Sequence, residues 1–581
     1  MKNKLSKIEK KWQVKDVDKE KIKDVCSQLG VTPAVAQVLI NRNITEMEEA
    51  KKFLKPSLKD LILPERFTQM EEAVEKIVET IKEGKKVFVY GDYDVDGITA
   101  TSILCRFFDA VGAKYNFYIP HRIEEGYGLN TAALDEIAQS GAALLITVDC
   151  GVCSSKEVDY AVQLGMDVVI TDHHVPEEKL PEAASAVIHP MLDDYPSPKS
   201  CGAMVAMKLA WALCEEYRGS GLSDKQCRDL LLISTDFASL GTVADVMPLT
   251  GENRSLISYG LNSLRLSSLP GIRALMNAAG LSGKSLDTFD LSFRISPMLN
   301  AAGRMGHARL AVELLTTDND IRALRIAEYL KEQNNQRKKI EKRILKEASH
   351  LISATGLDHP DRRSIIIAGE EWHLGIVGIV ASRIIEKFYK PTILLNSDGK
   401  LSTGSARTIE GFNILNAINA CSDHLVKFGG HSEAAGITIE TENLPRFVED
   451  FEEYAKENVS DDILVQKLEI EGWFGIKNFS PKTFQQLEKI APFGKGNPRP
   501  LFAARGIRLE GSPQKIGAAK EHLRFVIRDA GGRMPCVAFK MASYYNKLLE
   551  SDYFSVAFEP IFNEYNGEKR PQFVIRDFKF D

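Results

Sequence analysis

The sequence has no apolar run long enough to cross a membrane, and its first residues, Met-Lys-Asn-Lys-Leu, show no signal-peptide core. Cysteine is scarce: the nine cysteines are odd in number and scattered, so we expect no disulfide framework. Cys150 and Cys153 form one CxxC pair, but the second pair that a zinc site would need is missing. We therefore expect a cytoplasmic protein with no membrane segment and with reduced cysteines.

An excess of positive charge is also missing, because the formal net charge is −6. This value argues against a generally basic nucleic-acid-binding protein, but it leaves room for a local basic channel. The hydrophobic content of 44% and the charged content of 27% are those of an ordinary globular protein. A chain of 581 residues is too long for one hydrophobic core, so we expect about three or four domains.

The most informative stretch runs from Val87 to Gly97. A short apolar run, typical of a buried strand, leads into Asp92, Asp94 and Asp96. A helix is expected to follow from Ile98. Three carboxylates at the end of a strand repel one another and raise each other's pKa, unless a cation neutralises them. The stretch therefore predicts a site for Mg²⁺ or Mn²⁺, which prefer carboxylate oxygens. A solvated acidic turn is the alternative.

Strand-like and helix-like segments alternate from Phe67 to about Leu256. Strands are expected at Lys86–Tyr90, Tyr115–Ile119, Leu144–Val148, Val168–Thr171 and Ala186–Ile188, and helices at Ile98–Val111, Ser154–Leu164 and Cys201–Tyr217. Ser154 and Glu157 have the spacing of a capping box. The alternation predicts a parallel sheet with helices on both faces, whose ligands bind beyond the carboxyl ends of the strands.

Other possible metal ligands follow the later segments of this region. They are Asp149, the run Asp172, His173 and His174, and Asp245, which follows the helix-like run Leu230–Phe237. Taken singly, each aspartate could be a cap or turn residue and each histidine a surface or core residue. Together at one sheet edge, they provide enough ligands for two metal ions. Two ions suit in-line displacement at phosphorus.

These clusters resemble, in order, the four motifs of the DHH phosphoesterase superfamily. The matching segments are Asp92–Gly97, Asp149, Asp172–His174 and Gly241–Asp245. The DYDVDG form of the first motif and the GTVADVMPL stretch are similar to the bacterial RecJ branch of this superfamily. No motif departs from the family pattern, so the resemblance implies an active enzyme.

The resemblance also implies the roles of individual residues. Two Mn²⁺ or Mg²⁺ ions would be bound by Asp92, Asp94, Asp96, Asp149, His173 and Asp245. His174 would lie close to the scissile phosphate, so the catalytic residues would be Asp94, His173 and His174.

Two arginines are expected to bind phosphate near the same edge. Arg122 lies in the segment His121–Gly128, directly after a strand-like run. Arg304 ends the segment Asn300–Arg304, which resembles the NAAGR motif of the family. The guanidinium fork suits phosphate oxygens. The alternative for the second segment is a tight loop that packs two helices.

The segment from Asp318 to about Ala354 contains neither proline nor glycine and is expected to be one helix. Its length would be roughly 50 Å, enough to join two domains. Lys331–Lys346 holds seven basic residues against two acidic ones. This stretch could contact a nucleic-acid strand or could be a solvated linker.

A second alternating region extends from Arg363 to about Lys456. Three of its segments, Glu371–Gly378, Ser405–Arg407 and Phe428–Ser432, resemble the DHH-associated domain. The resemblance implies that the substrate is held by Ser405, Arg407, Gly430 and His431. Glycine lets the backbone approach a phosphate closely, and serine, arginine and histidine can donate to it.

Segments with a period of two dominate from about Leu464 onward. They are Leu468–Trp473, Phe502–Leu509, Leu523–Arg528, Met534–Phe539, Tyr553–Phe562 and Gln572–Phe580, with turn signals at Gly531-Gly532 and Asn566-Gly567. A five- or six-stranded barrel of the OB type is expected. Arg524, Phe525 and Phe539 are candidates for contacting single strands, and plain barrel core is the alternative for each aromatic residue.

The expected fold class is α/β: a DHH-type parallel-sheet domain and a DHH-associated domain joined by a long helix, followed by an OB-fold β-barrel. The expected domains are an N-terminal helical segment, the DHH catalytic domain, a helical region with the connecting helix, the DHH-associated domain and the OB domain, at residues 1–66, 67–262, 263–356, 357–460 and 461–581.

The resemblance implies a single-stranded-DNA-specific exonuclease that works from 5′ to 3′, releases 5′-mononucleotides and acts in DNA recombination and repair. A helicase and a single-strand-binding protein would be its partners, and the multidomain plan suggests a monomer. Two other functions stay open. A phosphodiesterase for short RNA or cyclic dinucleotides would not need the long helix and the barrel, and a non-enzymatic replication scaffold would not need the intact set of carboxylates.

Overall fold

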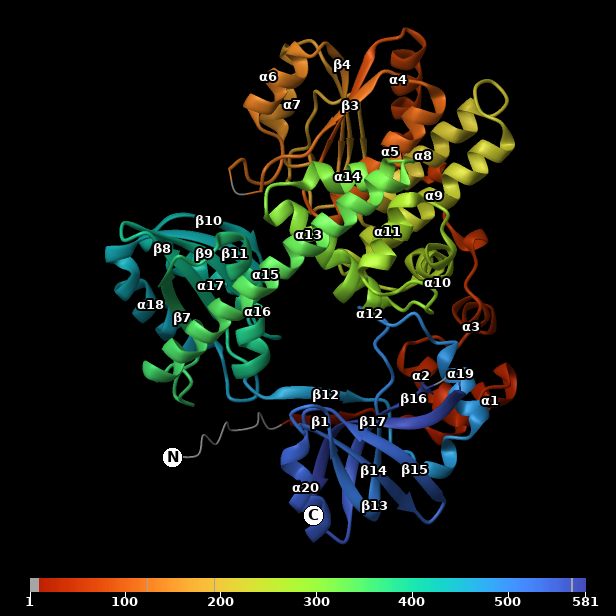
Figure 1. Cartoon of the computed structure of the whole chain (residues 1–581), viewed down its shortest axis with the longest axis vertical. Helices are drawn as coiled ribbons and strands as arrows, with labels where there is room; N and C mark the ends of the chain where they lie inside the picture. Colours follow the sequence, from red (N-terminus) through yellow and green to blue (C-terminus); the bar gives the residue numbers. More distant parts are fainter. Residues whose placement is uncertain (1–9, 123, 193, 566–567, 581) are drawn as a thin grey trace. The chain divides into compact units, whose positions relative to one another are not determined.

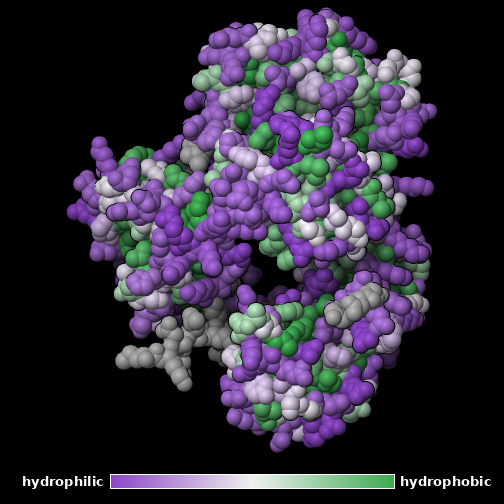
Figure 2. Space-filling view, viewed as in Figure 1, coloured by the Kyte–Doolittle hydropathy of each residue, from purple (hydrophilic) through white to green (hydrophobic). Residues whose placement is uncertain are grey.

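The computed structural model describes residues 10–122, 124–192, 194–565 and 568–580. They form two compact units, shown in Figure 1. One unit is Leu61–Leu464, and the other, here called the barrel unit, combines the described residues up to Asp60 with those from Val465 onward. No helix among these residues is both long and apolar enough to span a membrane. Hydrophilic side chains cover most of the face seen in Figure 2.

The first sheet of the 61–464 unit consists of five parallel strands in the order β3-β2-β4-β5-β6. Their bounds are β2 Lys86–Gly91, β3 Tyr115–Tyr118, β4 Ala142–Val148, β5 Asp167–Thr171 and β6 Ala186–Ile188. The strands expected from the sequence are confirmed to within two residues. Because the sheet is buried on both faces, β4 and β5 are apolar almost throughout.

Helices cover both faces of this sheet (Figure 1). One face packs against α4 Met70–Lys82, α5 Val95–Val111 and α8 Gly202–Tyr217, with α9 Asp224–Ala244 packed on α5 and α8 in the same core. The other face packs against α6 Thr131–Gln139 and α7 Ser155–Gln163. Neighbouring residues of β2 point to opposite faces: Val87 and Val89 belong to the first core, and Phe88 and Tyr90 to the second.

Two local expectations about these helices are wrong. Helix α5 begins at Val95, not at Ile98, because the side chain of Asp94 caps it. Ser154 precedes α7, but its side chain makes no capping hydrogen bond, so the capping box with Glu157 does not form. The backbone of Ser154 lies at φ −108° and ψ 43°, outside the extended conformation from which a serine side chain normally caps a helix.

A helical region follows α9 and ends in a helix of 35 residues, α15 Asp320–Ala354. The preceding helices are α10 Gly251–Leu266, α11 Pro270–Ala278, α12 Thr288–Asp290, α13 Ser296–Arg304 and α14 Ala308–Thr316, with a π-helical turn at Leu291–Ile295 between α12 and α13. The first part of α15 places Ile326 and Leu330 in the core of the first sheet. Its last part places Ile344 and Ile352 in another core, so α15 joins the two sheets of the unit as expected.

The second sheet is mixed, in the order β10-β11-β9-β8-β7. Its elements are β7 Ile365–Glu370, α16 Leu374–Phe388, β8 Thr392–Ser397, β9 Leu401–Arg407, α17 Ile414–Ala420, β10 Leu425–His431, β11 Ala434–Glu440 and α18 Leu444–Asn458. Only β7 and β8 pair in parallel, and the other neighbours are antiparallel. Helices α17 and α18 pack on one face, and α15 and α16 on the other.

The barrel unit contains a closed five-stranded barrel in the order β13-β14-β15-β17-β16. Its strands are β13 Phe502–Ile516, β14 His522–Asp529, β15 Gly532–Ala538, β16 Phe554–Tyr565 and β17 Glu568–Phe580, with α19 Pro481–Glu488 before them and α20 Tyr545–Glu550 between β15 and β16. Helices α1 Lys19–Leu29, α2 Pro33–Asn41 and α3 Met47–Leu54 share one hydrophobic core with the barrel. The Asn566-Gly567 turn lies outside the described residues.

The structure corrects two expectations in this unit and decides one alternative. Lys10–Val14 is a strand, β1, rather than part of a helical segment, and it pairs in parallel with β12 Gln466–Ile470. The first expected barrel strand, near Leu468–Trp473, therefore lies in this separate pair instead of in the barrel. Phe525 is only 4% exposed and belongs to the core, so the alternative of plain barrel core holds for it.

Candidate metal centre and phosphate-binding arginines

The first motif forms a tight turn between β2 and α5. The Oδ1 atom of Asp94 accepts hydrogen bonds from the backbone N–H groups of Asp96 (2.8 Å) and Gly97 (3.2 Å). Glycine is needed at position 97, because a Cβ there would lie 2.6 Å from the backbone nitrogen of Asp92. The turn therefore gathers three carboxylates at the carboxyl end of β2.

The carboxylate of Asp96 is held by the start of helix α8. It accepts hydrogen bonds from the backbone N–H groups of Gly202 (2.6 Å) and Ala203 (2.9 Å), which are free donors at a helix N-terminus. Helix α9 approaches from another side, where a Cβ on Gly241 would lie 2.4 Å from Oδ1 of Asp96. Asp96 is consequently fixed in one position and only 1% exposed.

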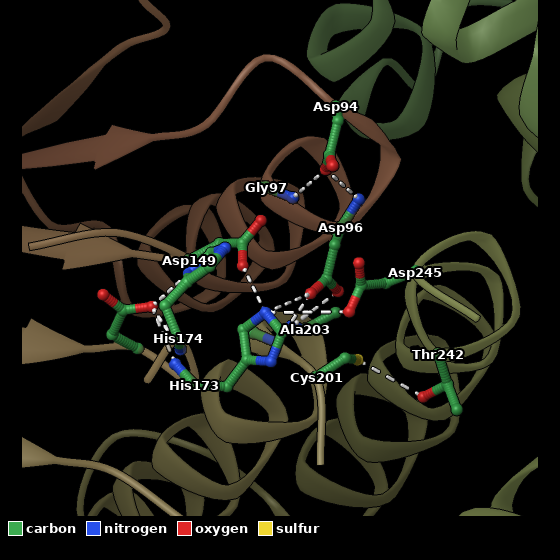
Figure 3. A network of polar contacts seen from close by, with 12 residues as sticks. Asp94, Asp96, Gly97, Asp149, His173, His174, Cys201, Ala203, Thr242 and Asp245 are labelled. Carbon is green, nitrogen blue, oxygen red and sulfur yellow. Dashed lines mark hydrogen bonds and ion pairs between the residues drawn. The ribbon is translucent and has the colours of Figure 1, made fainter. Parts of the chain in front are cut away.

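His173 lies at the centre of the cluster, as Figure 3 shows. Its Nε2 atom is 3.1 Å from Oδ1 of Asp149 and 3.7 Å from a carboxylate oxygen of both Asp96 and Asp245. Asp149 follows β4, His173 follows β5 and Asp245 is the C-cap of α9. Burial lowers the pKa of His173, which favours the neutral imidazole that a metal ion requires. The strand ends thus bring these side chains together, as predicted.

Three overlapping groups of side chains have ligand atoms within 4.8 Å of one another. They are Asp92 with Asp94 and Asp149, Asp96 with His173 and Asp245, and Asp149 with His173 and His174. Burial and neighbouring carboxylates raise the pKa of Asp92, Asp94 and Asp149. Among the described side chains, Oδ1 of Asp92 is also buried without a hydrogen-bond partner. A divalent cation such as Mn²⁺ or Mg²⁺ fits these donors, because it offsets the cost of burying several like charges together.

His174 has a different environment from its neighbour. Its Nδ1 atom lies 2.8 Å from Oδ1 of Asp172 and 2.9 Å from the hydroxyl of Tyr127. Burial disfavours the charged imidazole, but the hydrogen bond to Asp172 and the negative charges of Asp172, Asp245 and Asp92 together outweigh it, and the pKa of His174 rises to about 9. Burial also opposes the charge on Asp172, yet the contact with His174 lowers the pKa of Asp172 to about 2. This pair is therefore ionic at neutral pH.

Arg122 and Arg304 lie beside the acidic turn. The guanidinium of Arg122 is 4.7 Å from the centre of the Tyr93 ring. Arg304 ends α13, and its Nη1 donates a hydrogen bond to the carbonyl of Gly375 (2.6 Å). Burial and the nearby charge of Arg122 lower the pKa of Arg304 to about 9, whereas Asp94 acts in the opposite direction. Guanidinium groups that repel one another in this way are stabilised by an anion.

The rest of the Asn300–Arg304 segment packs α13 against the acidic turn. The side-chain oxygen of Asn300 accepts a hydrogen bond from the backbone N–H of Val95 (3.2 Å). A Cβ on Gly303 would lie 2.3 Å from the carbonyl oxygen of Tyr93. Asn300 and Gly303 therefore serve packing, but as the end of helix α13 and not as the tight loop between two helices that was the alternative. Arg304 extends its side chain toward the second sheet.

Ser405 and Arg407 interact directly on strand β9. The Nη1 group of Arg407 donates hydrogen bonds to Oγ of Ser405 (2.6 Å) and to the carbonyl of Ala406 (2.7 Å). Burial and the charge of Arg122 lower the pKa of Arg407. Since Arg122 and Arg407 both lower the pKa of Arg304, the structure places these three predicted arginines in one group.

Gly430 and His431 lie at the end of strand β10 in the same sheet. They pair with Ala435 and Ala434 of β11, whose other neighbour is β9. Both residues are exposed, and the imidazole of His431 accepts a hydrogen bond from the backbone N–H of Glu433 (3.3 Å). The ladder places Ala434 between His431 and Arg407, but no side-chain hydrogen bond or ion pair among the described residues joins Gly430 or His431 to the arginine group.

Sequence reasoning missed Tyr127 and Arg337. Arg337 lies in α15, is 7% exposed and adds to the charges that lower the pKa of Arg304. It is held by Asn334 (3.1 Å) and Glu341 (2.8 Å). The basic stretch of α15 gives no signal that separates this buried arginine from its solvated neighbours. The glycines on either side of Tyr127 are a signal, because they indicate a loop built to place that side chain.

Comparisons with known proteins agree with this geometry. Three family models match: the N-terminal domain of the DHH family over residues 86–235, the DHHA1 domain over 362–457 and the RecJ OB domain over 470–577. The single-stranded-DNA-specific exonuclease RecJ of Bacillus subtilis is 34% identical over 571 residues, which cover 98% of this chain and 70% of that protein. The Escherichia coli protein of the same name is 32% identical, with 94% and 95% covered.

Solved structures give the same result. The crystal structure of RecJ in complex with Mn²⁺ from Thermus thermophilus matches with a TM-score of 0.83 and 30% sequence identity, covering 98% of this chain and 80% of that one. The Mg²⁺ complex from the same organism matches with a TM-score of 0.78. From these similarities along nearly its whole length, we conclude that the chain belongs to the RecJ family of DHH proteins.

Proposed function

We propose that this protein is a single-stranded-DNA-specific exonuclease that hydrolyses phosphodiester bonds from the 5′ end and releases 5′-mononucleotides in DNA recombination and repair. The observation that carries the proposal is the buried cluster around His173, in which carboxylates that follow β2 and β4 and one at the end of α9 meet the imidazole that follows β5. It lies beside a group of arginines suited to phosphate. The names of the similar proteins support the substrate class.

The residues that would hold Mn²⁺ or Mg²⁺ are two of the groups described above. Asp92, Asp94 and Asp149 would bind one ion, and Asp96, His173 and Asp245 the other. When bound, such ions supply Lewis-acid activation of water and neutralise charge that develops on phosphate. The protein holds these donors ready: Asp94 through the start of α5, and Asp96 through the start of α8.

His174 would act on the phosphate itself. With a pKa of about 9, it carries a positive charge at neutral pH, and Asp172 occupies its Nδ1 side. The Nε2–H group is then left to donate to an oxygen of the scissile phosphate. Negative charge grows on these oxygens in the transition state, so a fixed donor in a buried site lowers the barrier.

The arginines would hold the strand by its phosphates. Arg122, Arg304 and Arg407 repel one another, and a DNA phosphate would offset that repulsion. Ser405, Gly430 and His431 would extend this contact along the second sheet. Phosphate contacts fix the register of the strand without reading its sequence, as a nuclease that degrades any strand requires.

The wider assignment is part of the same proposal. The domain limits at residues 66, 262, 356 and 460, the monomeric state and a cytoplasmic location are predictions that accompany it. A helicase and a single-strand-binding protein are the expected partners, because an exonuclease restricted to single strands needs duplex DNA to be opened. The barrel would serve as a platform for the strand, as barrels of this type often do.

The decisive experiment is the Mn²⁺-dependent degradation of 5′-labelled single-stranded DNA by the wild-type protein and by Asp94→Ala. We expect labelled mononucleotides at the earliest times with the wild type, and none with a variant that is still folded and still binds DNA. Cleavage of dinucleotides but not of long DNA would favour the small-substrate phosphodiesterase. Equal rates on single strands and blunt duplexes would overturn strand specificity, and no cleavage of any substrate would favour a scaffold.

A further inference from the structure

The loop between β3 and α6 brings one further side chain to the reaction centre. Tyr127 is flanked by Gly126 (φ 84°) and Gly128 (φ 88°), both in the left-handed region that favours glycine. Its hydroxyl lies 2.9 Å from Nδ1 of His174 and 3.4 Å from the carbonyl oxygen of Asp149. The two rings also meet edge to face, with 5.1 Å between their centres.

The base of this loop is firmly anchored, so the position of Tyr127 is well defined. The carboxylate of Glu125 accepts hydrogen bonds from the hydroxyl of Tyr118 (2.6 Å), from the side chain of Asn130 (3.1 Å) and from the backbone N–H of His121. Three donors on one carboxylate fix the residue two positions before Tyr127.

The pattern of donors and acceptors around His174 defines what the tyrosine does. The carboxylate of Asp172 already accepts hydrogen bonds from the backbone N–H groups of Val152, His173 and His174, so it acts as an acceptor and Nδ1 of His174 carries the proton that points to it. The Tyr127 oxygen faces the same N–H and acts as a second acceptor. Its own proton is then free to point to the carbonyl of Asp149, which accepts.

The backbone of His174 is fixed as well. Its carbonyl oxygen accepts a hydrogen bond from Nε2 of His189 (2.7 Å). The other nitrogen of His189 accepts from the backbone N–H of Met191 (3.1 Å), which places the His189 proton on Nε2. His174 is therefore held at its backbone and on one side of its ring, and no hydrogen bond or ion pair of the described residues uses its Nε2 atom.

We propose that Tyr127 is a positioning residue, whose hydroxyl works with Asp172 to aim the Nε2–H group of His174 at the scissile phosphate. This inference rests on the proposed function and extends it to a residue outside the four motifs. Asp172 alone fixes one direction at Nδ1, and the imidazole can still rotate about that hydrogen bond. A second acceptor on the same N–H, together with the ring contact, restricts this rotation.

The same loop also carries Arg122, five residues before Tyr127, and Arg122 lies over the ring of Tyr93 in the acidic turn. A phosphate bound by Arg122 would therefore hold the loop in the arrangement that orients His174. Substrate binding at Arg122 and orientation of the imidazole by Tyr127 would then be coupled.

The test is Tyr127→Phe, which removes the hydroxyl and keeps the ring. Tyr127 is 48% exposed, so the variant should fold like the wild type, and thermal unfolding checks this. With 5′-phosphorylated single-stranded DNA and Mn²⁺, we expect kcat to fall by about tenfold, the effect of one lost hydrogen bond in a transition state, while KM stays unchanged. Tyr160→Phe is the matched control, because it removes a tyrosine–aspartate hydrogen bond outside the site.

A double-mutant cycle separates positioning from a general structural effect. In a His174→Ala background, Tyr127→Phe should have no further effect on kcat, because the hydroxyl then has nothing to orient. Mn²⁺ affinity, measured by calorimetry without substrate, should equal that of the wild type in both single variants.

Each other outcome counts against a stated part of the reasoning. Full activity of Tyr127→Phe beside an impaired His174→Ala overturns the positioning role alone. An equal loss in both backgrounds, or weaker Mn²⁺ binding, shows a structural effect and also overturns it. Full activity of His174→Ala overturns the role of His174 in the proposed function, and with it the inference about Tyr127.

Discussion

Asp236 allows a quantitative test of how burial controls charge in this protein. It lies in α9, is 4% exposed, and its Oδ1 atom has no hydrogen-bond partner among the described residues. Burial raises its pKa from the ordinary value of 3.8 to about 7, against the opposing effect of a hydrogen bond from Ser263. The folded protein therefore keeps a proton that the unfolded chain loses between these two pH values.

The sign of the effect on stability follows from this difference. When folding raises the pKa of a carboxyl group, the proton bound in the folded state adds to the free energy of unfolding. This contribution is complete below the pKa of the unfolded state and is lost as the pH rises to the pKa of the folded state. Between about pH 4 and pH 7 the free energy of unfolding falls by about 1.4 kcal/mol per pH unit, and it then levels off after a total loss of about 4 kcal/mol. Between pH 5 and pH 8, Asp236 should account for a loss of about 2.5 kcal/mol.

The variant Asp236→Asn keeps the size of the side chain but does not titrate. From pH 5 to pH 8, the wild type should lose about 2.5 kcal/mol more unfolding free energy than the variant. The cost of burying the amide is the same at both pH values, so it does not affect this comparison. Urea unfolding followed by circular dichroism, in EDTA throughout, gives the two slopes. Parallel pH curves would refute the reasoning, because they would mean that Asp236 is ionised in the folded protein.

Two further predictions concern the core and the metal centre. Lys208 and Glu252 form a fully buried ion pair at 2.7 Å, so Lys208→Met should lower the unfolding free energy by about 3–5 kcal/mol by leaving a buried charge unpaired. Adding Glu252→Gln to this variant should restore part of the lost unfolding free energy in the same urea titration. Equal unfolding free energies of the single and the double variant would contradict the prediction. Gly241→Ala would place a Cβ 2.4 Å from Oδ1 of Asp96, so Mn²⁺ affinity measured by calorimetry should fall by about tenfold or more. Unchanged affinity would mean that Asp96 is not a ligand.

The parts of the site that follow strand ends could be predicted from sequence. Asp92, Asp149 and His173 come directly after apolar runs, and parallel strands direct their carboxyl ends to one edge. That rule needs only the order of strands and helices, which the chain encodes locally. The closeness of these three side chains therefore follows from local sequence patterns and one rule of sheet topology.

The parts that depend on distant partners could not be predicted. Asp96 is held by Gly202 and Ala203, more than 100 positions later, and no local pattern links these segments. The hydroxyl of Tyr127 reaches His174 only because its loop folds over the end of β5. The sequence predicts that helix α5 starts at Ile98 and not at Val95, because Asp94 was interpreted as a metal ligand and not as the residue that caps the helix.

The barrel shows a similar limit. A period of two identifies strands, but it does not say which alternate side chains face inward, and Phe525 proved to be core. Strand β1 has only five residues, and its partner β12 lies at the other end of the chain, so its own sequence could not distinguish it from the helices that follow.

The composition of the barrel unit has a consequence for synthesis on the ribosome. Helix α2 buries its apolar residues in a core that the barrel strands complete, and those strands emerge last. At ordinary elongation rates, the roughly 400 residues between the two parts take tens of seconds to appear. During that time the residues up to Asp60 lack the barrel strands that complete their hydrophobic core, while the 61–464 unit can already fold. A chain released before β13 would hold a folded metal centre and an exposed apolar helix, a combination that favours aggregation and removal by proteases.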